Sequence, residues 1–213
     1  NSYPAAKPET VEAYVGALHR EIDLVARHID NSRQISQIHY GGGSPTSIPI
    51  PMLKELNDHL LSIAPTIASP EIAIECHPGY LSEHDWQQLT ACGFTRYSIG
   101  IQDMKEEVLK AVNRRPSLLP LQEILQILRA SGATVNFDFI YGLPLQSVDS
   151  FRKTIEQASA LRPDRLVTFS YAHLPKLFPR QQILDRMGLP ATEEKNRMYE
   201  TASEILRQAG YQS

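Results

Sequence analysis

Cysteine is scarce in this chain of 213 residues, which contains only Cys76 and Cys92. Their spacing fits neither a metal-binding pair nor a disulfide scaffold, so we expect two buried thiols and a reducing compartment, the cytoplasm. Long apolar runs are missing as well, and none approaches the roughly 20 residues that span a bilayer. Residues 1–10 lack the basic and apolar pattern of a signal peptide. We therefore expect no membrane span.

An excess of positive charge is also lacking, since 21 basic residues stand against 24 acidic ones. A formal charge of −3 gives no electrostatic footprint for nucleic acid, so we expect no nucleic-acid partner. Several motifs are absent too: the phosphate-binding loop, the Gly-x-Ser-x-Gly elbow, the dinucleotide fingerprint and clustered metal ligands. The chemistries that depend on these motifs are therefore not indicated.

The sequence does contain a regular alternation: short runs of β-branched residues are followed by glycine or proline, and then by longer stretches in which apolar residues have helical spacing. This alternation is typical of repeated βα units, in which the strands are parallel. The length suits a single domain, which we expect to span residues 1–213. Five strands are predicted, at Gln34–Tyr40, Glu71–Cys76, Arg96–Ile101, Val135–Ile140 and Leu166–Phe169.

Helices are predicted before, between and after these strands. Ser82 begins one of them with acidic residues in its first turn, and Gly93 supplies its stop, as Gly210 does for the last helix. About five βα units are too few for a closed eight-stranded barrel. We predict an α/β fold with an incomplete parallel (β/α) barrel. The predicted helices are Pro8–Ile29, Pro51–Ala64, Ser82–Cys92, Met104–Asn113, Leu119–Ala130, Val148–Leu161 and Thr192–Ala209.

Three consecutive glycines, Gly41 to Gly43, follow the first predicted strand, where they allow backbone to approach a ligand closely. The carboxyl ends of parallel strands meet at one face, which is where α/β proteins bind ligands. Arginine, acidic groups and glycine backbone would together suit a zwitterionic small molecule with sugar hydroxyls. The polar residues at the other strand ends are Glu75, Gln102, Asp103, Asp138, Ser170, Tyr171 and His173, and Arg114 and Arg115 lie on the helix–loop segment that follows Asp103.

Each of these residues also has a structural interpretation. Glu75 could be a buried structural carboxylate, and Gln102 could cap a strand. Asp138 favours function, because an ionised group inside an apolar strand is costly unless it is paired. His173 could be a loop histidine and His39 a satisfied core residue, while His59 and His84 read as solvated helix positions. Aromatic packing under loops is the commoner use of Tyr40, Tyr141 and Tyr171.

Six motifs taken together resemble the oxygen-independent coproporphyrinogen III oxidases, a family of radical S-adenosylmethionine enzymes. The resemblance runs from about Ile38 to the C-terminus with matching order and spacing. The motifs are His39-Tyr40-Gly41-Gly42-Gly43-Ser44-Pro45-Thr46, Ile74-Glu75-Cys76-His77-Pro78, Ser98-Ile99-Gly100-Ile101-Gln102-Asp103, Val112-Asn113-Arg114, Asp138-Phe139-Ile140-Tyr141-Gly142-Leu143-Pro144 and Tyr171-Ala172-His173-Leu174-Pro175.

The resemblance implies a haem-biosynthesis oxidoreductase that decarboxylates two propionates of coproporphyrinogen III to give protoporphyrinogen IX. In this family a 4Fe-4S cluster reduces S-adenosylmethionine, and the resulting 5′-deoxyadenosyl radical abstracts a propionate hydrogen. By motif match, Gly43 and Ser44 would meet the methionine end of S-adenosylmethionine, and the rest of that pocket would be lined by Glu75, Gln102, Arg114, Asp138 and Ala172. The porphyrinogen is the expected partner, whereas neither the electron donor nor a catalytic residue is indicated.

One departure from the family concerns the cluster. The family holds it on Cys-x-x-x-Cys-x-x-Cys in a loop before the first helix, and Cys76 and Cys92 occupy other positions. No metal ligand is assigned in this chain, which we expect to be a core that lacks the cluster loop, the first strand and the C-terminal domain, and to be inactive by itself. Two alternatives stay open: an oxidase-like haem chaperone with the same core, and a non-catalytic nucleoside-binding module.

Overall fold

The computed structural model describes residues 7–30 and 32–212. The chain divides into two compact units. Unit 1 comprises the described residues of Asn1–Cys76, Ser82–Ser98 and Gln126–Thr134, and unit 2 comprises those of His77–Leu81, Ile99–Leu125 and Val135–Ser213. A domain can contain two such units, so the single domain over residues 1–213 stays a prediction.

The described residues form five strands, each at a place where a strand is predicted, in the sheet order β1-β2-β3-β4-β5. A sheet whose order follows the chain is what successive βα units produce. The strands are β1 (Ile35–Tyr40), β2 (Thr66–Cys76), β3 (Arg96–Gln102), β4 (Thr134–Tyr141) and β5 (Arg165–Ser170).

In unit 1, β1 and β2 pair in parallel, with Tyr40 opposite Ile74. The prediction that β2 begins at Glu71 is wrong, because the strand begins at Thr66 and passes through Pro70. The pairing register shifts between Ile35 and Gln37, opposite the segment that contains Pro70. Proline lacks the N–H that a regular ladder requires, so such an irregularity is where a strand accommodates it.

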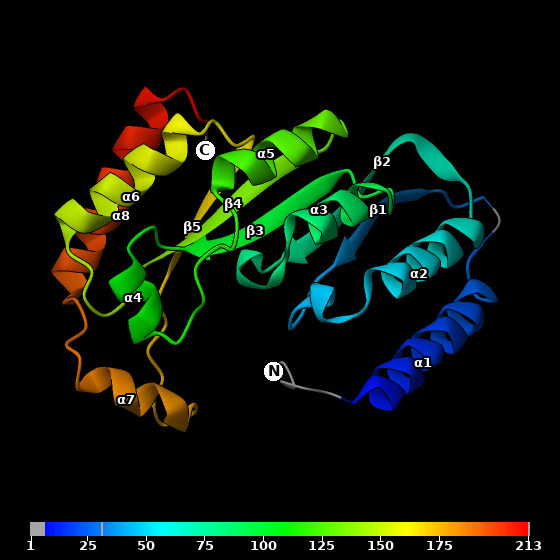
Figure 1. Cartoon of the computed structure of the whole chain (residues 1–213), viewed down its shortest axis with the longest axis horizontal. Coiled ribbons are helices and arrows are strands. Elements are labelled where there is room, and N and C mark those ends of the chain that lie inside the picture. Colours follow the sequence, from blue (N-terminus) through cyan, green and yellow to red (C-terminus); the bar gives the residue numbers. More distant parts are fainter. Residues whose placement is uncertain (1–6, 31, 213) are drawn as a thin grey trace. The chain divides into compact units, whose positions relative to one another are not determined.

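Three helices belong wholly to unit 1: α1 (Pro8–Ala26), α2 (Ile50–Ser62) and α3 (Glu83–Thr90). Helices α1 and α2 lie side by side (Figure 1). The predicted start of α3 is confirmed by a capping box, in which Ser82 and Asp85 each accept the other's backbone N–H. Its predicted stop is confirmed by Gly93, whose φ of +84° suits glycine.

His59 does not occupy the solvated helix position predicted for it. Its side chain is only 23% exposed, and its Nε2 lies 3.0 Å from Asp23 Oδ1. The rings of His59 and His19 stack with their centroids 5.0 Å apart, and their Nδ1 atoms are 2.7 Å apart. These contacts join α2 to α1, across a separation in sequence that local pattern does not report. His84 is exposed, as predicted.

The core of unit 1 packs α2 and α3 residues such as Leu53 and Trp86 with strand residues such as Ile74 and Tyr97, all of them fully buried. Asn57 is a fully buried polar residue of this core. Its Nδ2 donates to the carbonyl of Cys92 at 2.9 Å, and its Oδ1 accepts from the Tyr40 hydroxyl at 3.2 Å. Because both of these polar contacts are made, the amide can lie in the interior at low cost.

In unit 2, β4 and β5 pair in parallel, with Asp138 opposite Val167. Helices α6 (Val148–Ala160) and α8 (Thr192–Gln208) lie against each other (Figure 1). Their buried residues include Phe151, Ile155 and Met198, and Phe137 and Phe139 of β4 are also fully buried. The remaining helices are α4 (Glu106–Ala111), α5 (Leu121–Ala130) and α7 (Gln182–Asp185).

Several short elements are not foreseen by the sequence patterns: α7 and the three 3-10 turns η1 (Pro45–Ser47), η2 (Pro78–Tyr80) and η3 (Pro179–Gln181). Each is three or four residues long, which is too short to show a helical period. None of the helices in residues 7–30 and 32–212 has the length and apolar character needed to cross a bilayer.

Candidate functional site

The glycines that follow β1 expose main chain in unit 1. Gly42 has a φ of +104°, and nothing lies within 4 Å of the position that a Cβ would occupy there. Gly43 is exposed and Ser44 is half-buried. The Ser47 hydroxyl donates to the Ser44 carbonyl at 2.7 Å, which fixes the start of η1. The segment therefore presents backbone, as expected from three consecutive glycines.

A histidine and a carboxylate meet beside these glycines. His39 Nε2 lies 3.2 Å from Glu75 Oε1, and the two side chains are 45% and 43% exposed. A Cβ on Gly41 would lie 2.8 Å from His39 Nε2 and 3.1 Å from Glu75 Oε1, closer than ordinary contact. Gly41 therefore leaves room for the pair. Glu75 is neither fully buried nor isolated, and it holds a negative charge next to open backbone.

In unit 2, Arg114 reaches back to the end of β3. Its Nη2 donates to the carbonyl of Gly100, and a Cβ at Gly100 would lie 2.8 Å from that nitrogen. Burial lowers the pKa of the Arg114 guanidinium, and the charges of Tyr80 and Asp138 act in the opposite direction. Gly100 therefore provides the space in which a half-buried cation is held.

Gln102 ends β3 with a φ of +72°, in the left-handed region that non-glycine residues seldom occupy. Such backbone costs about 1–3 kcal/mol and occurs most often at functional sites. Its Nε2 lies 2.9 Å from the position of a Cβ on Gly100. Gln102 and Arg114 are thus both directed to the space above Gly100.

Asp138 is half-buried in β4 and accepts a hydrogen bond of 2.8 Å from Asn136 Nδ2. This hydrogen bond offsets part of the cost of placing a carboxylate in an apolar strand, and the functional role predicted for Asp138 stays a prediction. Its charge also contributes to the electrostatic surroundings of Arg114. Asp138 therefore lies within electrostatic reach of the cation in the same unit.

The residues that follow β5 take part in local hydrogen bonds. The exposed Ala172 uses its carbonyl to accept from Gln181 Nε2 at 3.1 Å. His173 pairs with Asp185 through its Nε2, and the Tyr171 hydroxyl is 3.5 Å from its Nδ1. Lys195 of α8 donates to the Tyr171 carbonyl at 2.8 Å. These bonds hold the backbone around Ala172 in place.

His77 is a candidate residue to which the sequence patterns assign no role. Its Nδ1 accepts the backbone N–H of Gly79 at 3.1 Å, which leaves Nε2 as the donor. Burial, assisted by the charge of Arg114, lowers the pKa of His77 to about 4, so the ring is neutral at pH 7. The Tyr80 ring packs edge-to-face with the His77 ring. The guanidinium carbon of Arg115 lies over the Tyr80 ring, 4.8 Å from its centroid. The sequence offered one signal for His77, namely that it directly follows Glu75 and Cys76 at the end of a predicted strand.

Asp103 has a structural role. It is 1% exposed and accepts hydrogen bonds from Gln146 Nε2 at 2.6 Å, from Thr154 Oγ1 at 2.8 Å and from the Lys105 backbone N–H at 2.8 Å. These donors engage both oxygens of a carboxyl group that follows directly on Gln102. Asp103 therefore fixes the chain that carries the unusual backbone of Gln102.

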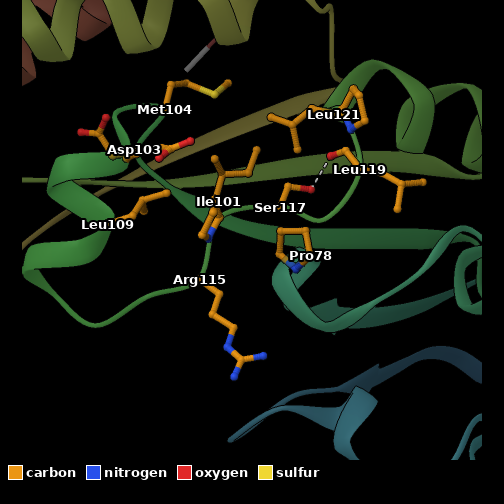
Figure 2. A pocket seen from close by; sticks show the side chains of 12 residues that line it. Pro78, Ile101, Asp103, Met104, Leu109, Arg115, Ser117, Leu119 and Leu121 are labelled. Atoms are coloured by element: carbon orange, nitrogen blue, oxygen red, sulfur yellow. Dashed lines mark hydrogen bonds between the residues drawn. The ribbon is translucent and has the colours of Figure 1, made fainter.

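Unit 2 contains a cavity of about 230 Å³, and none of the predicted cofactor residues lines it. Figure 2 shows mostly apolar side chains around it, among them Ile101, Leu109 and Leu119, while Arg115 extends away from the others. Asp103 is one of its few polar neighbours, and its carboxyl group is already hydrogen-bonded. The cavity therefore offers few polar groups that could orient a ligand.

Comparison with known proteins decides the family. The sequence model of the Radical SAM superfamily matches residues 9–158. The chain belongs to the radical SAM superfamily. It is 38% identical over 204 residues to the oxygen-independent coproporphyrinogen III oxidase of Pseudomonas aeruginosa, covering 93% of this chain and 44% of that protein. The Escherichia coli oxidase is 34% identical over 213 residues, covering 100% of this chain and 46% of that protein.

The solved structure of the Escherichia coli coproporphyrinogen III oxidase, HemN, a radical SAM enzyme, matches with a TM-score of 0.89 at 34% identity. The match covers 98% of this chain and 48% of that chain. A match to the archaeal Elp3 of Methanocaldococcus infernus has a TM-score of 0.61 at 19% identity, which bears on the fold alone. The predicted α/β fold of the radical SAM type is confirmed. The chain spans about half the length of the curated relatives it matches.

Neither cysteine of this radical SAM chain fits the role of a cluster ligand. Cys76 and Cys92 are free thiols, 5% and 4% exposed. Burial raises the pKa of both thiols, whereas iron–sulfur clusters are held by thiolates. Among the described residues there is also no group of three His, Cys, Asp or Glu side chains that could hold a metal ion.

Proposed function

We propose that the protein containing this chain performs the oxygen-independent oxidative decarboxylation of coproporphyrinogen III to protoporphyrinogen IX, as a radical SAM oxidoreductase of haem biosynthesis. The observation that carries the proposal is the similarity to curated oxidases, at 32–38% identity over more than nine tenths of this chain. The porphyrinogen is the proposed substrate. Two buried, unpaired thiols suit a reducing compartment, so we place the protein in the cytoplasm.

S-adenosylmethionine and a 4Fe-4S cluster are the proposed cofactors. Bound together, they supply a carbon radical that removes a hydrogen atom from a propionate side chain. The cluster would be held by residues other than Cys76 and Cys92, for the reasons given above. The residues proposed to hold S-adenosylmethionine are Gly43, Ser44 and Glu75 in unit 1, and Gln102, Arg114, Asp138 and Ala172 in unit 2.

Chemical matching supports these assignments. Arg114 keeps a cation in a half-buried position, so it suits the carboxylate of the methionine group. Glu75 has one oxygen next to His39 and is partly exposed, so it suits a cationic or hydroxyl donor. Asp138 and Gln102 supply acceptors and an amide donor for polar groups of the nucleoside. The glycine backbone before Ser44 allows close approach.

The function is tested with full-length protein under anaerobic conditions. Formation of protoporphyrinogen that depends on S-adenosylmethionine supports the oxidase. A stoichiometric haem complex without product would instead indicate the oxidase-like haem chaperone. If the reading frame encodes no cysteine triad before Asn1, the oxidase proposal fails. If it does encode one, the non-catalytic nucleoside-binding module loses its motivation.

Replacing Gly41 with alanine should weaken S-adenosylmethionine binding about three- to tenfold, because the new Cβ forces His39 and Glu75 apart and the carboxylate loses its hydrogen-bond partner. Isothermal titration calorimetry of the full-length variant measures this effect. Gly16→Ala in α1 is the control, since a Cβ there would make only an ordinary contact of 3.6 Å with Arg20. Equal affinities for the two variants would remove the His39–Glu75 pair from the site.

A further inference from the structure

The segment between β5 and α8 exposes a series of large apolar side chains. Figure 1 shows α7, in orange, on an excursion that leaves β5 and returns to α8. Its exposed residues are Leu174 at 47%, Leu177 at 71%, Phe178 at 56%, Ile183 at 61% and Met187 at 40%. Apolar side chains that gather on a surface, rather than occurring singly, mark sites of interaction.

Local hydrogen bonds hold this segment, residues 174–187, in shape. The Leu174 carbonyl accepts the backbone N–H groups of both Leu177 and Phe178. Gln181 Oε1 accepts the Leu174 N–H at 2.6 Å, and its Nε2 donates to the Ala172 carbonyl. The contact between His173 Nε2 and Asp185 Oδ1 closes the excursion. The segment is therefore an ordered surface although most of its apolar side chains are exposed.

The spacing of the apolar residues places them together on each turn. Leu174, Leu177 and Phe178 are separated by three and four residues on one hydrogen-bonded turn, which directs them to one side. Ile183 and Met187 are four apart along α7 and its end. Leu184 of the same helix points inward and is 8% exposed. The outward side of the segment is therefore apolar.

Three exposed cations are interspersed with these apolar residues: Lys176, Arg180 and Arg186. Within the part of the chain that the structure describes, none of them has a carboxylate within 4.0 Å. The one acidic residue of the segment, Asp185, is engaged by His173. The surface thus combines apolar area with positive charge that the fold itself does not neutralise.

We propose that segment 174–187 binds the porphyrinogen, with its apolar side chains against the tetrapyrrole and Lys176, Arg180 and Arg186 on propionate carboxylates. This inference rests on the proposed function. The substrate has the matching chemistry, because an apolar macrocycle carries several carboxylates on its rim. The segment also begins two residues after Ala172, which is proposed to contact S-adenosylmethionine, and is bonded to it through Gln181. An anionic membrane surface would also attract these three cations. However, α7 has only four residues, which is too short for a helix that lies in a bilayer surface.

The test uses full-length protein and coproporphyrin III, the oxidised and fluorescent form of the substrate, in anaerobic fluorescence titrations. Lys176→Gln combined with Arg180→Gln should weaken coproporphyrin binding at least about tenfold, since each loses a charge-assisted contact. S-adenosylmethionine affinity should stay within twofold. The control combines Lys153→Gln with Arg197→Gln, which removes one exposed lysine and one exposed arginine elsewhere in unit 2.

The apolar part is tested by Leu177→Ser, with Leu118→Ser as the control because Leu118 is 60% exposed in unit 2 outside the segment. Leu177→Ser should weaken coproporphyrin binding and leave the unfolding midpoint equal to that of the control. A lower midpoint for Leu177→Ser alone would show that the rest of the protein buries this surface and would overturn the proposal. The proposal would also be overturned if K176Q/R180Q and the control K153Q/R197Q bound coproporphyrin with equal affinity, even if the enzyme makes protoporphyrinogen.

Two further outcomes distinguish the proposed porphyrinogen-binding surface from the proposed oxidase activity and from a membrane-binding surface. Wild-type protein that makes no product but binds coproporphyrin through Lys176 and Arg180 would refute the proposed activity and support the binding surface. Loss of binding to phosphatidylserine vesicles in K176Q/R180Q, with coproporphyrin affinity unchanged, would assign the surface to a membrane and overturn the proposal.

Discussion

Replacing Asp103 with alanine is expected to lower the free energy of unfolding by about 3 kcal/mol or more, because several donors lose their acceptor at once. Gln146 and Thr154 are 6% and 2% exposed, so their donors cannot turn to bulk water. Each also comes from a part of the chain far from Asp103 in sequence, 43 and 51 residues away. The substitution therefore removes the long-range contacts to Gln146 and Thr154 as well as the local bond to the Lys105 backbone N–H.

Urea unfolding followed by circular dichroism measures this effect, with Asp149→Ala as the matched control. Asp149 is an exposed carboxylate in the first turn of α6, and Arg152 is 3.9 Å away, so its loss should change the free energy of unfolding by no more than about 1 kcal/mol. Asp103→Asn keeps an acceptor oxygen and should fall between the two. Unfolding midpoints that coincide for Asp103→Ala and Asp149→Ala would contradict the structural role of Asp103.

The elements that the sequence predicts well are those specified by local signals. Helix α3 is an example, because Ser82 and Asp85 form its cap and Gly93 its stop within one short stretch. The strand positions follow from apolar runs in the same way. Strand β2 shows the limit, since Pro70 interrupts the local pattern while pairing with β1 continues on both sides of it. A tertiary partner thus extends a strand beyond its sequence signal.

The residues of the candidate site also fall into two groups, those indicated by local sequence signals and those that depend on tertiary structure. Residue types at strand ends point to Glu75 and Asp138, because charge next to an apolar strand is visible in sequence. Arg114 follows helix α4, and it is indicated by the family motif Val112-Asn113-Arg114. The positive φ of Gln102 is not visible, since backbone conformation there depends on the whole end of β3. The hydrogen bonds that reach Asp103 from Gln146 and Thr154 arise from residues distant in the chain, so its burial as a structural group could not be predicted.

Replacing Arg114 with alanine in full-length protein is expected to weaken S-adenosylmethionine binding by roughly 1.5–3 kcal/mol, the value of a hydrogen bond to a charged group. That corresponds to a loss of affinity of about 10- to 150-fold. The guanidinium is held by the Gly100 carbonyl, so little further ordering is required when a carboxylate binds. Arg114→Lys keeps the charge without the planar fork and should show an intermediate loss.

Calorimetry with two ligands separates a contact to the carboxylate from a general disturbance of the site. S-adenosylmethionine carries the methionine carboxylate, whereas 5′-methylthioadenosine lacks it, so Arg114→Ala should weaken only the first. Arg115→Ala is the matched control, because Arg115 is the neighbouring arginine but is exposed and packs on Tyr80. If Arg114→Ala weakens both ligands alike, the guanidinium supports the fold around Gly100 and does not bind the carboxylate; if it weakens neither, Arg114 lies outside the site.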